Sequence, residues 1–205
     1  MSTRRWFAPA ALSLGLACGV FGYLRPVLGQ KHGAHAWHAQ APLPARSLYG
    51  LDSEFVTDSR ARLEFGALRG HFQILALIFT RCPTVCPMLV HDLKALERAM
   101  PADVSAATRF TLVSIDPEHD TPEALGAYRI KHELDEEHWF LLRGEPEAVR
   151  DLSALLGFSF SGAGGAAIAH SKLVTVLNRD GEVILQQESA AADPEKIIDA
   201  IARAL

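Results

Sequence analysis

A short apolar strand that runs directly into a pair of cysteines is the feature that most constrains this chain. Residues 74–79 are continuously apolar, as in a strand buried on both faces of a sheet. Cys82 and Cys86 follow, and apolar side chains then recur at helical spacing over residues 89–100. The pattern predicts a buried strand, a loop that carries the cysteines, and a helix whose first turn contains Pro87, where proline is tolerated.

The rest of the chain predicts an α/β fold. Strand-like and helix-like segments alternate over residues 47–205, which is typical of a sheet covered by helices on both faces. Further strands are expected at residues 110–115, 139–142, 172–177 and 182–186, and further helices begin near Thr121, Pro146 and Asp193. Residues 178–181, Asn-Arg-Asp-Gly, are a hairpin signature. This order predicts a thioredoxin-like central sheet flanked by helices.

The first 25 residues predict a membrane-anchoring helix. Residues 6–24 contain no charged side chain and lie between Arg5 and Arg25, so the run is long enough to cross a bilayer. Its basic start favours a cytoplasmic N-terminus, which places the globular part on the periplasmic side of the cytoplasmic membrane. A cleaved signal peptide is the alternative, although no clear small-x-small cleavage site follows the run.

Residues 26–46 are rich in Ala, Pro, His and Gln and predict a flexible linker. His32, His35 and His38 recur there at every third position. They are either an auxiliary metal-collecting arm or part of a polar linker. We favour the linker, because a mobile segment loses conformational entropy when it closes around a metal.

With residues 1–25 and 26–46 set aside, residues 47–205 have room for one domain. The formal net charge is −4, and the basic residues are scattered along the chain. A nucleic-acid-binding surface needs clustered Lys and Arg to contact the phosphate backbone. We therefore expect no nucleic acid partner.

The cysteine pair predicts metal or redox chemistry. Cys18 lies in the apolar N-terminal run, which leaves Cys82 and Cys86 as a close pair rather than a disulfide framework. A pair between a strand and a helix start lies where helix amides stabilise thiolates. Three intervening residues put the sulfurs about one helical turn apart, which suits both a disulfide and a soft ion such as Cu(I). The spacing alone leaves both open.

A third ligand would favour a metal. His170 lies in a loop immediately before a predicted strand, where a thioredoxin-like fold brings a loop toward the cysteines; on pattern alone, a solvent-exposed loop histidine is an equal alternative. Asp116 and Asp120 either lie near such a site or serve a turn and a helix start. Five other histidines lie in polar surroundings and are predicted to be surface residues: His71, His91, His119, His132 and His138.

Three ordered motifs resemble those of the Sco/SenC family of copper-binding, thioredoxin-like assembly proteins of cytochrome c oxidase. The resemblance covers about Ser47 to the C-terminus. Its motifs are Phe-Thr-x-Cys-Pro-x-x-Cys-Pro at residues 79–87, Val-Ser-Ile-Asp-Pro-Glu-x-Asp-Thr-Pro-Glu at residues 113–123, and His170 ahead of a strand that leads to Asp180-Gly181. An upstream Leu-Arg-Gly at residues 68–70 also fits.

The resemblance implies that Cys82, Cys86 and His170 bind copper, as Cu(I), with Cu(II) left open. It implies a metallochaperone, not an enzyme, that delivers copper to cytochrome c oxidase or helps assemble its copper centre. Its expected partners are the copper-bearing oxidase subunit and other copper chaperones. Thr84 and Ala169 stand where the family usually has Asp, which affects the surroundings of the ligands and partner docking but none of the three ligands.

The alternative function is a thiol-disulfide reductase that keeps the oxidase copper-site cysteines reduced. In that hypothesis Cys82 attacks, Cys86 resolves the mixed disulfide, and the two form a redox-active disulfide. The same residues thus serve both hypotheses, and His170 separates them.

Overall fold

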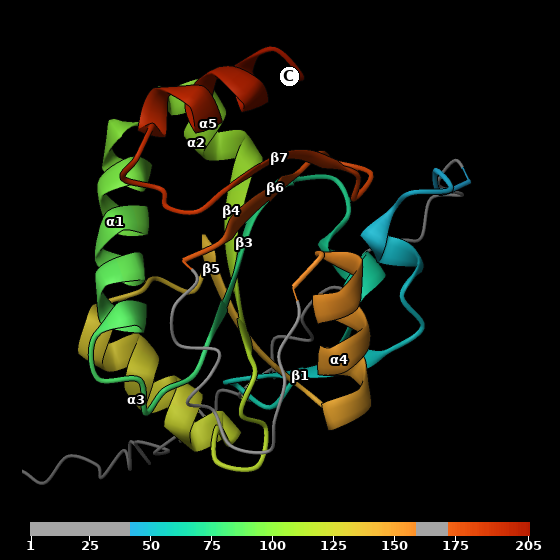
Figure 1. Ribbon diagram of the computed structural model, residues 1–205, viewed down its shortest axis with the longest axis vertical. Coiled ribbons are helices and arrows are strands. Elements are labelled where there is room, and N and C mark those ends of the chain that lie inside the picture. The colour runs from blue at the N-terminus through green and yellow to red at the C-terminus, as the bar shows by residue number, and fades with distance from the viewer. Residues whose placement is uncertain (1–41, 159–171) are drawn as a thin grey trace, which may run out of the picture. The chain divides into compact units, whose positions relative to one another are not determined.

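A single mixed sheet organises the part of the chain that the computed structural model describes, residues 42–158 and 172–205. Its strands are β1 Glu54–Thr57, β2 Arg62–Glu64, β3 Phe72–Ile78, β4 Thr108–Ser114, β5 Trp139–Gly144, β6 Val174–Leu177 and β7 Val183–Gln187. They lie in the order β2-β1-β5-β4-β3-β6-β7 (Figure 1). The three central strands, β5, β4 and β3, are parallel, and the outer strands are antiparallel to their neighbours.

Strand β3 is buried on both faces, as its continuous apolar run predicts. Phe72, Ile74 and Ile78 belong to one hydrophobic core, whereas Leu75 belongs to a second core across the sheet. Parallel strands covered by helices on both sides have this composition. The predicted strand is confirmed and begins two residues earlier than expected.

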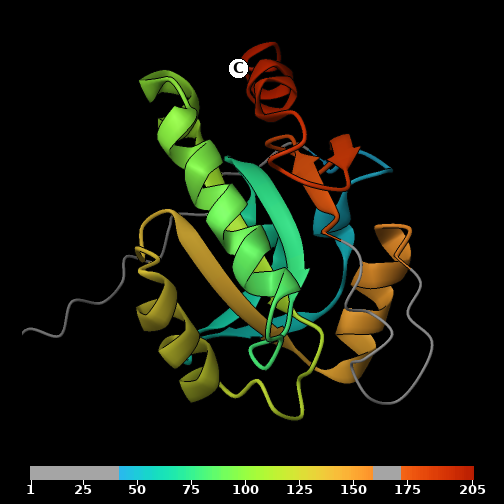
Figure 2. The same ribbon diagram turned by 60° about the vertical axis from the view of Figure 1, so that its left-hand side comes forward.

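Five α-helices of the described chain cover the sheet: α1 Val85–Ala99, α2 Ala102–Ala107, α3 Pro122–His132, α4 Pro146–Leu155 and α5 Pro194–Ala202. Figures 1 and 2 show α1 and α3 on one face and α4 on the other. Buried residues of α2 and α5 join the core beneath α1 and α3. The short 3-10 helices Leu48–Gly50 and Phe65–Leu68 join the core beneath α4. The predicted thioredoxin-like α/β arrangement is confirmed.

Local signals placed the helix starts correctly. The Thr121 side chain accepts a hydrogen bond from the backbone N–H of Ala124 at 3.3 Å. In the same way, the Asp193 side chain accepts from the backbone N–H of Lys196 at 3.0 Å and caps the last helix. The sequence did not predict β1, β2 or α2. These elements have only four, three and six residues, and so are too short to show a clear hydrophobic period.

The β6–β7 hairpin accepts hydrogen bonds from Ser47 and Leu48, which lie near the start of the described chain. The backbone N–H of Leu48 donates to the carbonyl of Gly181 at 2.9 Å, and the Ser47 hydroxyl donates to the carbonyl of Asp180. Gly181 has φ 84°, and a Cβ there would lie 2.6 Å from the Tyr49 ring. Because β6 is antiparallel to β3, this hairpin lies at the end of the sheet where β3 begins.

The expected anchor at residues 1–25 lies outside the described residues, as does most of the expected linker. Within residues 42–158 and 172–205, no helix combines the length and the apolar character that a membrane crossing requires.

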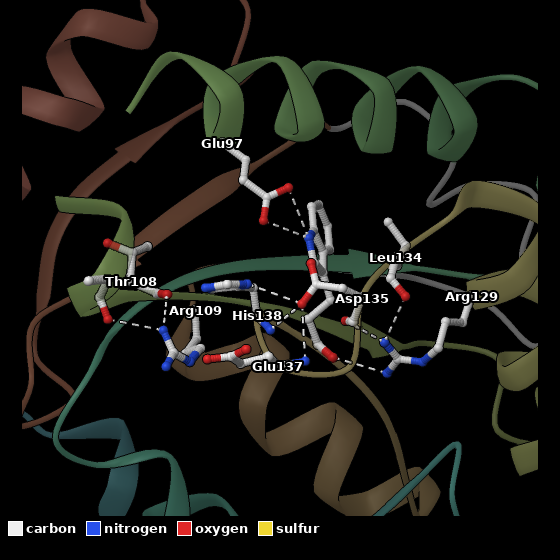
Figure 3. A network of polar contacts seen from close by, with 10 residues as sticks. Glu97, Thr108, Arg109, Arg129, Leu134, Asp135, Glu137 and His138 are labelled. Carbon is white, nitrogen blue, oxygen red and sulfur yellow. Dashed lines mark hydrogen bonds and ion pairs between the residues drawn. The ribbon is translucent and has the colours of Figure 1, made fainter. Parts of the chain in front are cut away.

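A polar network fixes the start of β5 (Figure 3). The Trp139 ring is buried and stacks on Phe110 at 4.4 Å between centroids, and its indole N–H donates to both carboxylate oxygens of Glu97 at 3.1 Å. Asp135 accepts from the backbone N–H groups of Glu137 at 3.0 Å and His138 at 2.7 Å. The network ties the C-terminal half of α1 to the turn before β5.

Among the described residues, Glu97 is the side chain that accepts the hydrogen bond of the buried Trp139 indole N–H. The pKa of Glu97 lies above its usual value, chiefly because the carboxyl is partly buried. The hydrogen bond from Trp139 lowers the pKa, and the nearby Asp135 carboxylate raises it. The folded state therefore holds this proton more tightly than the unfolded chain does. Stability contributed by the protonated form is lost as the pH rises from the unfolded pKa, about 4.3, through the folded one.

We predict that Glu97→Gln keeps an acceptor for Trp139 and changes the free energy of unfolding at pH 7 little, with a gain of at most about 0.5 kcal/mol. That gain should vanish at pH values below about 3, where the wild-type carboxyl is protonated in both states. Glu97→Ala leaves the buried indole N–H unpaired and should cost about 1–3 kcal/mol. Urea unfolding at pH 3 and pH 7 measures both effects, and equal stability of the two variants would contradict the role assigned to Glu97.

Candidate metal centre

The two cysteines lie where β3 ends and α1 begins. The backbone N–H of Cys82 donates to the carbonyl of Phe79 at 3.1 Å in the turn after β3, and Cys86 is the second residue of α1. Their exposed fractions are only 4% and 5%, and both are free thiols. The predicted strand, cysteine loop and helix are confirmed.

The Cys82 sulfur receives the hydrogen bonds of the helix start. The backbone N–H of Cys86 donates to Cys82 Sγ at 3.3 Å. Burial raises the pKa of the Cys82 thiol, but hydrogen bonds from the Cys86 backbone and thiol, and from the backbone of Thr84 and Val85, outweigh burial and lower it. Cys82 is therefore the thiol that ionises more readily.

Cys86 has the opposite environment. The pKa of the Cys86 thiol is raised to about 12, and burial is the largest cause. A hydrogen bond with the Phe79 backbone lowers the pKa, whereas Cys82 and Asp120 raise it further. Its surroundings belong to the main hydrophobic core. The pair is thus asymmetric: Cys82 is prepared as a thiolate, and Cys86 keeps its proton unless a cation or a hydrogen-bond donor compensates the charge.

Asp120 ties the cysteine loop to the loop after β4. Its carboxylate is fully buried and accepts from the Thr80 backbone N–H at 3.1 Å, from the Thr80 hydroxyl at 2.5 Å and from the Ser114 hydroxyl at 2.6 Å. The sequence left open whether Asp120 lies near the cysteines or serves the helix start. The structure places it directly beneath the cysteine loop, through Thr80.

Asp116 binds two polar side chains, one of which belongs to Arg81, the residue before Cys82. Arg81 donates to its carboxylate at 2.7 Å, and His119 Nδ1 lies 2.8 Å from the other oxygen. Burial raises the pKa of Asp116, but His119 and Arg81 outweigh burial and lower it. Asp116 also accepts, through its backbone carbonyl, from the N–H groups of His119 and Asp120, which is the turn role that the sequence offered.

Tyr128 of α3 shares the hydrophobic core of the two cysteines, and the sequence analysis did not single it out. Its side chain is 4% exposed and packs in the same core as Cys82 and Cys86. Burial raises its pKa, and the charges of Cys86, Cys82 and Asp120 raise it further. The available signal was Leu125 and Tyr128 at positions i and i+3 of one helix, a spacing that predicts burial but no particular neighbour.

The third expected ligand, His170, lies outside the described residues. The chain that follows it is described: β6 begins with Val174 paired to Ala76, two residues before the end of β3. Lys172 Nζ also lies 3.7 Å from Asp92 of α1. Residues 172 and 173 therefore lead into β6 at the end of the sheet where the cysteines lie.

Of the other histidines, His91 and His119 are exposed, as predicted. His71, His132 and His138 also reach the surface but are partly buried. His132 packs its ring 4.2 Å from that of Tyr128, and His138 contacts Asp135 at 3.1 Å. Neighbours from tertiary packing, which local polarity does not reveal, account for the difference.

A second group of potential ligand side chains lies at the opposite end of α1. Glu97, Asp135 and His138 bring ligand atoms within 4.8 Å of one another. Both oxygens of Glu97 accept from Trp139, and Asp135 accepts from the turn before β5. These hydrogen bonds give the group a structural role at the start of β5.

The asymmetry of the pair predicts different reactivity of the two thiols. In Cys86→Ser, the remaining Cys82 should react with iodoacetamide at pH 7, and its rate should rise with pH to a midpoint below that of an ordinary thiol, about 8.5. In Cys82→Ser, the remaining Cys86 should react far more slowly at pH 7 because burial raises its pKa. Faster alkylation of Cys86 than of Cys82 would contradict this assignment.

Comparison with known proteins agrees with this architecture. A model of the SCO1/SenC family matches residues 45–205. A protein of Stutzerimonas stutzeri, named as a candidate copper-binding protein, is 27% identical over 176 residues, which are 84% of this chain and 82% of that protein.

Solved structures show the same fold. Copper-bound ScoI of Arabidopsis thaliana matches with a TM-score of 0.64 at 18% identity, over 74% of this chain and 96% of that one. BsSco, described as a member of the Sco family of cytochrome c oxidase assembly proteins with a disulfide switch, matches with a TM-score of 0.61 at 20% identity, over 73% and 91%. Together with the family match over residues 45–205, these findings show that the chain belongs to the SCO1/SenC family.

Proposed function

We propose that this protein is a copper metallochaperone in which Cys82, Cys86 and His170 bind Cu(I). The observation that carries the proposal is the buried pair of free thiols at the start of α1, with one sulfur prepared as a thiolate. Thiolates are soft ligands that select Cu(I), and an imidazole completes a three-coordinate site. The names of two similar proteins, one a candidate copper-binding protein and one with copper bound, support the choice of metal.

The chemistry of loading follows from the two thiols. Cys82 offers its thiolate first, and Cys86 then releases its proton as Cu(I) takes its place, because metal binding to thiols displaces protons. Asp120 holds the cysteine loop through Thr80 while this happens. In this proposal His170 supplies the third ligand, and β6, which begins four residues later in the chain, starts at the cysteine end of the sheet.

We further propose that the protein passes this copper to cytochrome c oxidase or helps assemble its copper centre, through contacts with the copper-bearing subunit and other copper chaperones. The description of BsSco as a member of a family of oxidase assembly proteins supports this. Next to Cys82, Arg81 and Asp116 form an ion pair, and His119 contacts Asp116. A docking partner would meet these groups at the cysteine loop.

A thiol-disulfide reductase is the second candidate. The lowered pKa of Cys82 suits an attacking thiol, and the buried Cys86 suits a resolving one. BsSco, in which a disulfide switch is described, supports this alternative. The two functions differ in their need for His170.

Anaerobic titration with Cu(I) against a coloured chelator tests the proposal. Wild type should bind one equivalent, with two sulfur neighbours and one nitrogen neighbour by X-ray absorption. Cys82→Ser should lose most of the affinity, and His170→Ala should lose roughly ten- to a hundredfold and the nitrogen neighbour. His91→Ala, an exposed histidine on α1, is the matched control and should bind as wild type does.

Unchanged copper affinity and geometry in His170→Ala would overturn the three-ligand site. If that variant still reduces a mixed disulfide at the wild-type rate while wild type binds copper poorly, the reductase is the function. If both variants fail in copper binding and wild type turns over no disulfide, the metallochaperone stands.

We propose that residues 1–25 anchor the protein in the cytoplasmic membrane with the domain on the periplasmic side. The full chain should then stay in the membrane fraction after a carbonate wash. Protease added to spheroplasts should remove the domain. Recovery of the full chain in the wash supernatant, or protection of the domain from protease, would contradict the anchor.

A further inference from the structure

An ion pair joins the chain immediately before β6 to helix α1. Lys172 Nζ lies 3.7 Å from Asp92 Oδ2, and the two side chains are only 23% and 17% exposed. Within residues 42–158 and 172–205, neither side chain forms another ion pair. Because water and salt screen a partly buried pair less than an exposed one, this contact restrains the chain more than a usual surface pair does.

The two partners lie on segments that are connected to expected copper ligands. Asp92 is on α1, whose second residue is Cys86. Lys172 follows His170 by two residues and precedes Val174, the first residue of β6. Buried residues of α1 and β6 also share one hydrophobic core. The ion pair therefore connects the helix of one expected ligand to the chain that follows another.

The sequence before His170 contains no side chain that could make such a contact. Residues 162–169 are only Gly, Ala and Ile, which have no charged or hydrogen-bonding side-chain group. An extended chain advances at most about 3.6 Å per residue, so the Cα atoms of residues 170 and 172 lie no more than about 7 Å apart. A contact that fixes Lys172 therefore limits the positions that His170 can take.

We infer that Asp92 and Lys172 are positioning residues of the proposed copper site, and that their ion pair holds the chain next to His170 against α1. This rests on the proposed copper function. Neither of the two side chains binds the metal in this role. The ion pair reduces the conformational freedom that the chain loses when the histidine binds copper, and a ligand restrained in advance binds more tightly for this reason.

Positioning and simple electrostatics predict opposite effects for one of the two partners. The negative charge of Asp92 favours a nearby Cu(I) cation, and the positive charge of Lys172 disfavours it. If charge alone mattered, Asp92→Asn would weaken copper binding and Lys172→Met would strengthen it. If the ion pair positions the ligand, both substitutions weaken copper binding, because each breaks the same contact.

The test measures Cu(I) affinity in the full chain for Asp92→Asn, Lys172→Met and the double variant. Each single variant should bind about tenfold more weakly, the lower range for loss of a group that supports a metal ligand, and the double variant should bind no more weakly than either. The nitrogen neighbour in X-ray absorption should weaken while both sulfur neighbours remain. Glu147→Gln, which removes a 3.6 Å ion pair with Arg150 on α4, is the control and should bind as wild type does.

The same substitution in a His170→Ala chain separates positioning from a general effect on folding. Lys172→Met should weaken copper binding no further there, because the ion pair acts through the histidine. A further loss of affinity in that chain, or stronger binding by Lys172→Met alone, would overturn the inference.

Additive losses in the double variant, or wild-type affinity in either single variant, would also overturn the inference and leave the proposed function intact. If wild type binds no Cu(I), or if His170→Ala binds copper as wild type does, the proposed three-ligand site fails and the inference fails with it.

Discussion

The burial of β3 between two hydrophobic cores is the constraint on which the rest of the structure depends. Alternate side chains of this strand fill both cores, and its backbone pairs with β4 on one side and β6 on the other. The strand therefore has little freedom to slide or tilt, since a shift of one residue would exchange its two faces. Because Cys82 follows four residues after Ile78, the fixed end of β3 determines where the sulfurs lie.

The cysteine pair combines two opposing demands. Burial excludes water and competing ligands, yet it disfavours the thiolates that a soft metal requires. The structure meets these demands unequally: the amides at the start of α1 stabilise Cys82, and the apolar core holds Cys86 in its protonated form. In the proposed copper site, a cation that supplies positive charge would compensate the cost of ionising Cys86.

Local patterns predicted the elements whose residues carry a strong period or a clear cap. The apolar run of β3, the face of α1 and the caps at Thr121 and Asp193 depend on neighbours close in sequence, and these predictions were confirmed. The contact of Asp120 with Thr80 spans forty positions and depends on the parallel pairing of β3 and β4. No local pattern encodes such a contact.

For a related reason, the sequence did not predict the short strands or the side chains that pack in the core with the cysteines. Strands β1 and β2 are held by pairing with each other and with β5 rather than by their own composition. The sequence analysis did not single out Tyr128, and its place in the same core as the cysteines follows from how α3 packs on the sheet. The expected role of His170 rests on the resemblance and on the entry of β6 at the cysteine end of the sheet.

The hydrogen bonds between the β6–β7 hairpin and residues Ser47 and Leu48 have a geometric consequence for the domain. The hairpin lies at the end of the sheet opposite the cysteines, so a chain fastened there presents its sulfurs away from the point of attachment. A partner can therefore reach the cysteine loop without displacing the hydrogen bonds that hold Ser47 and Leu48.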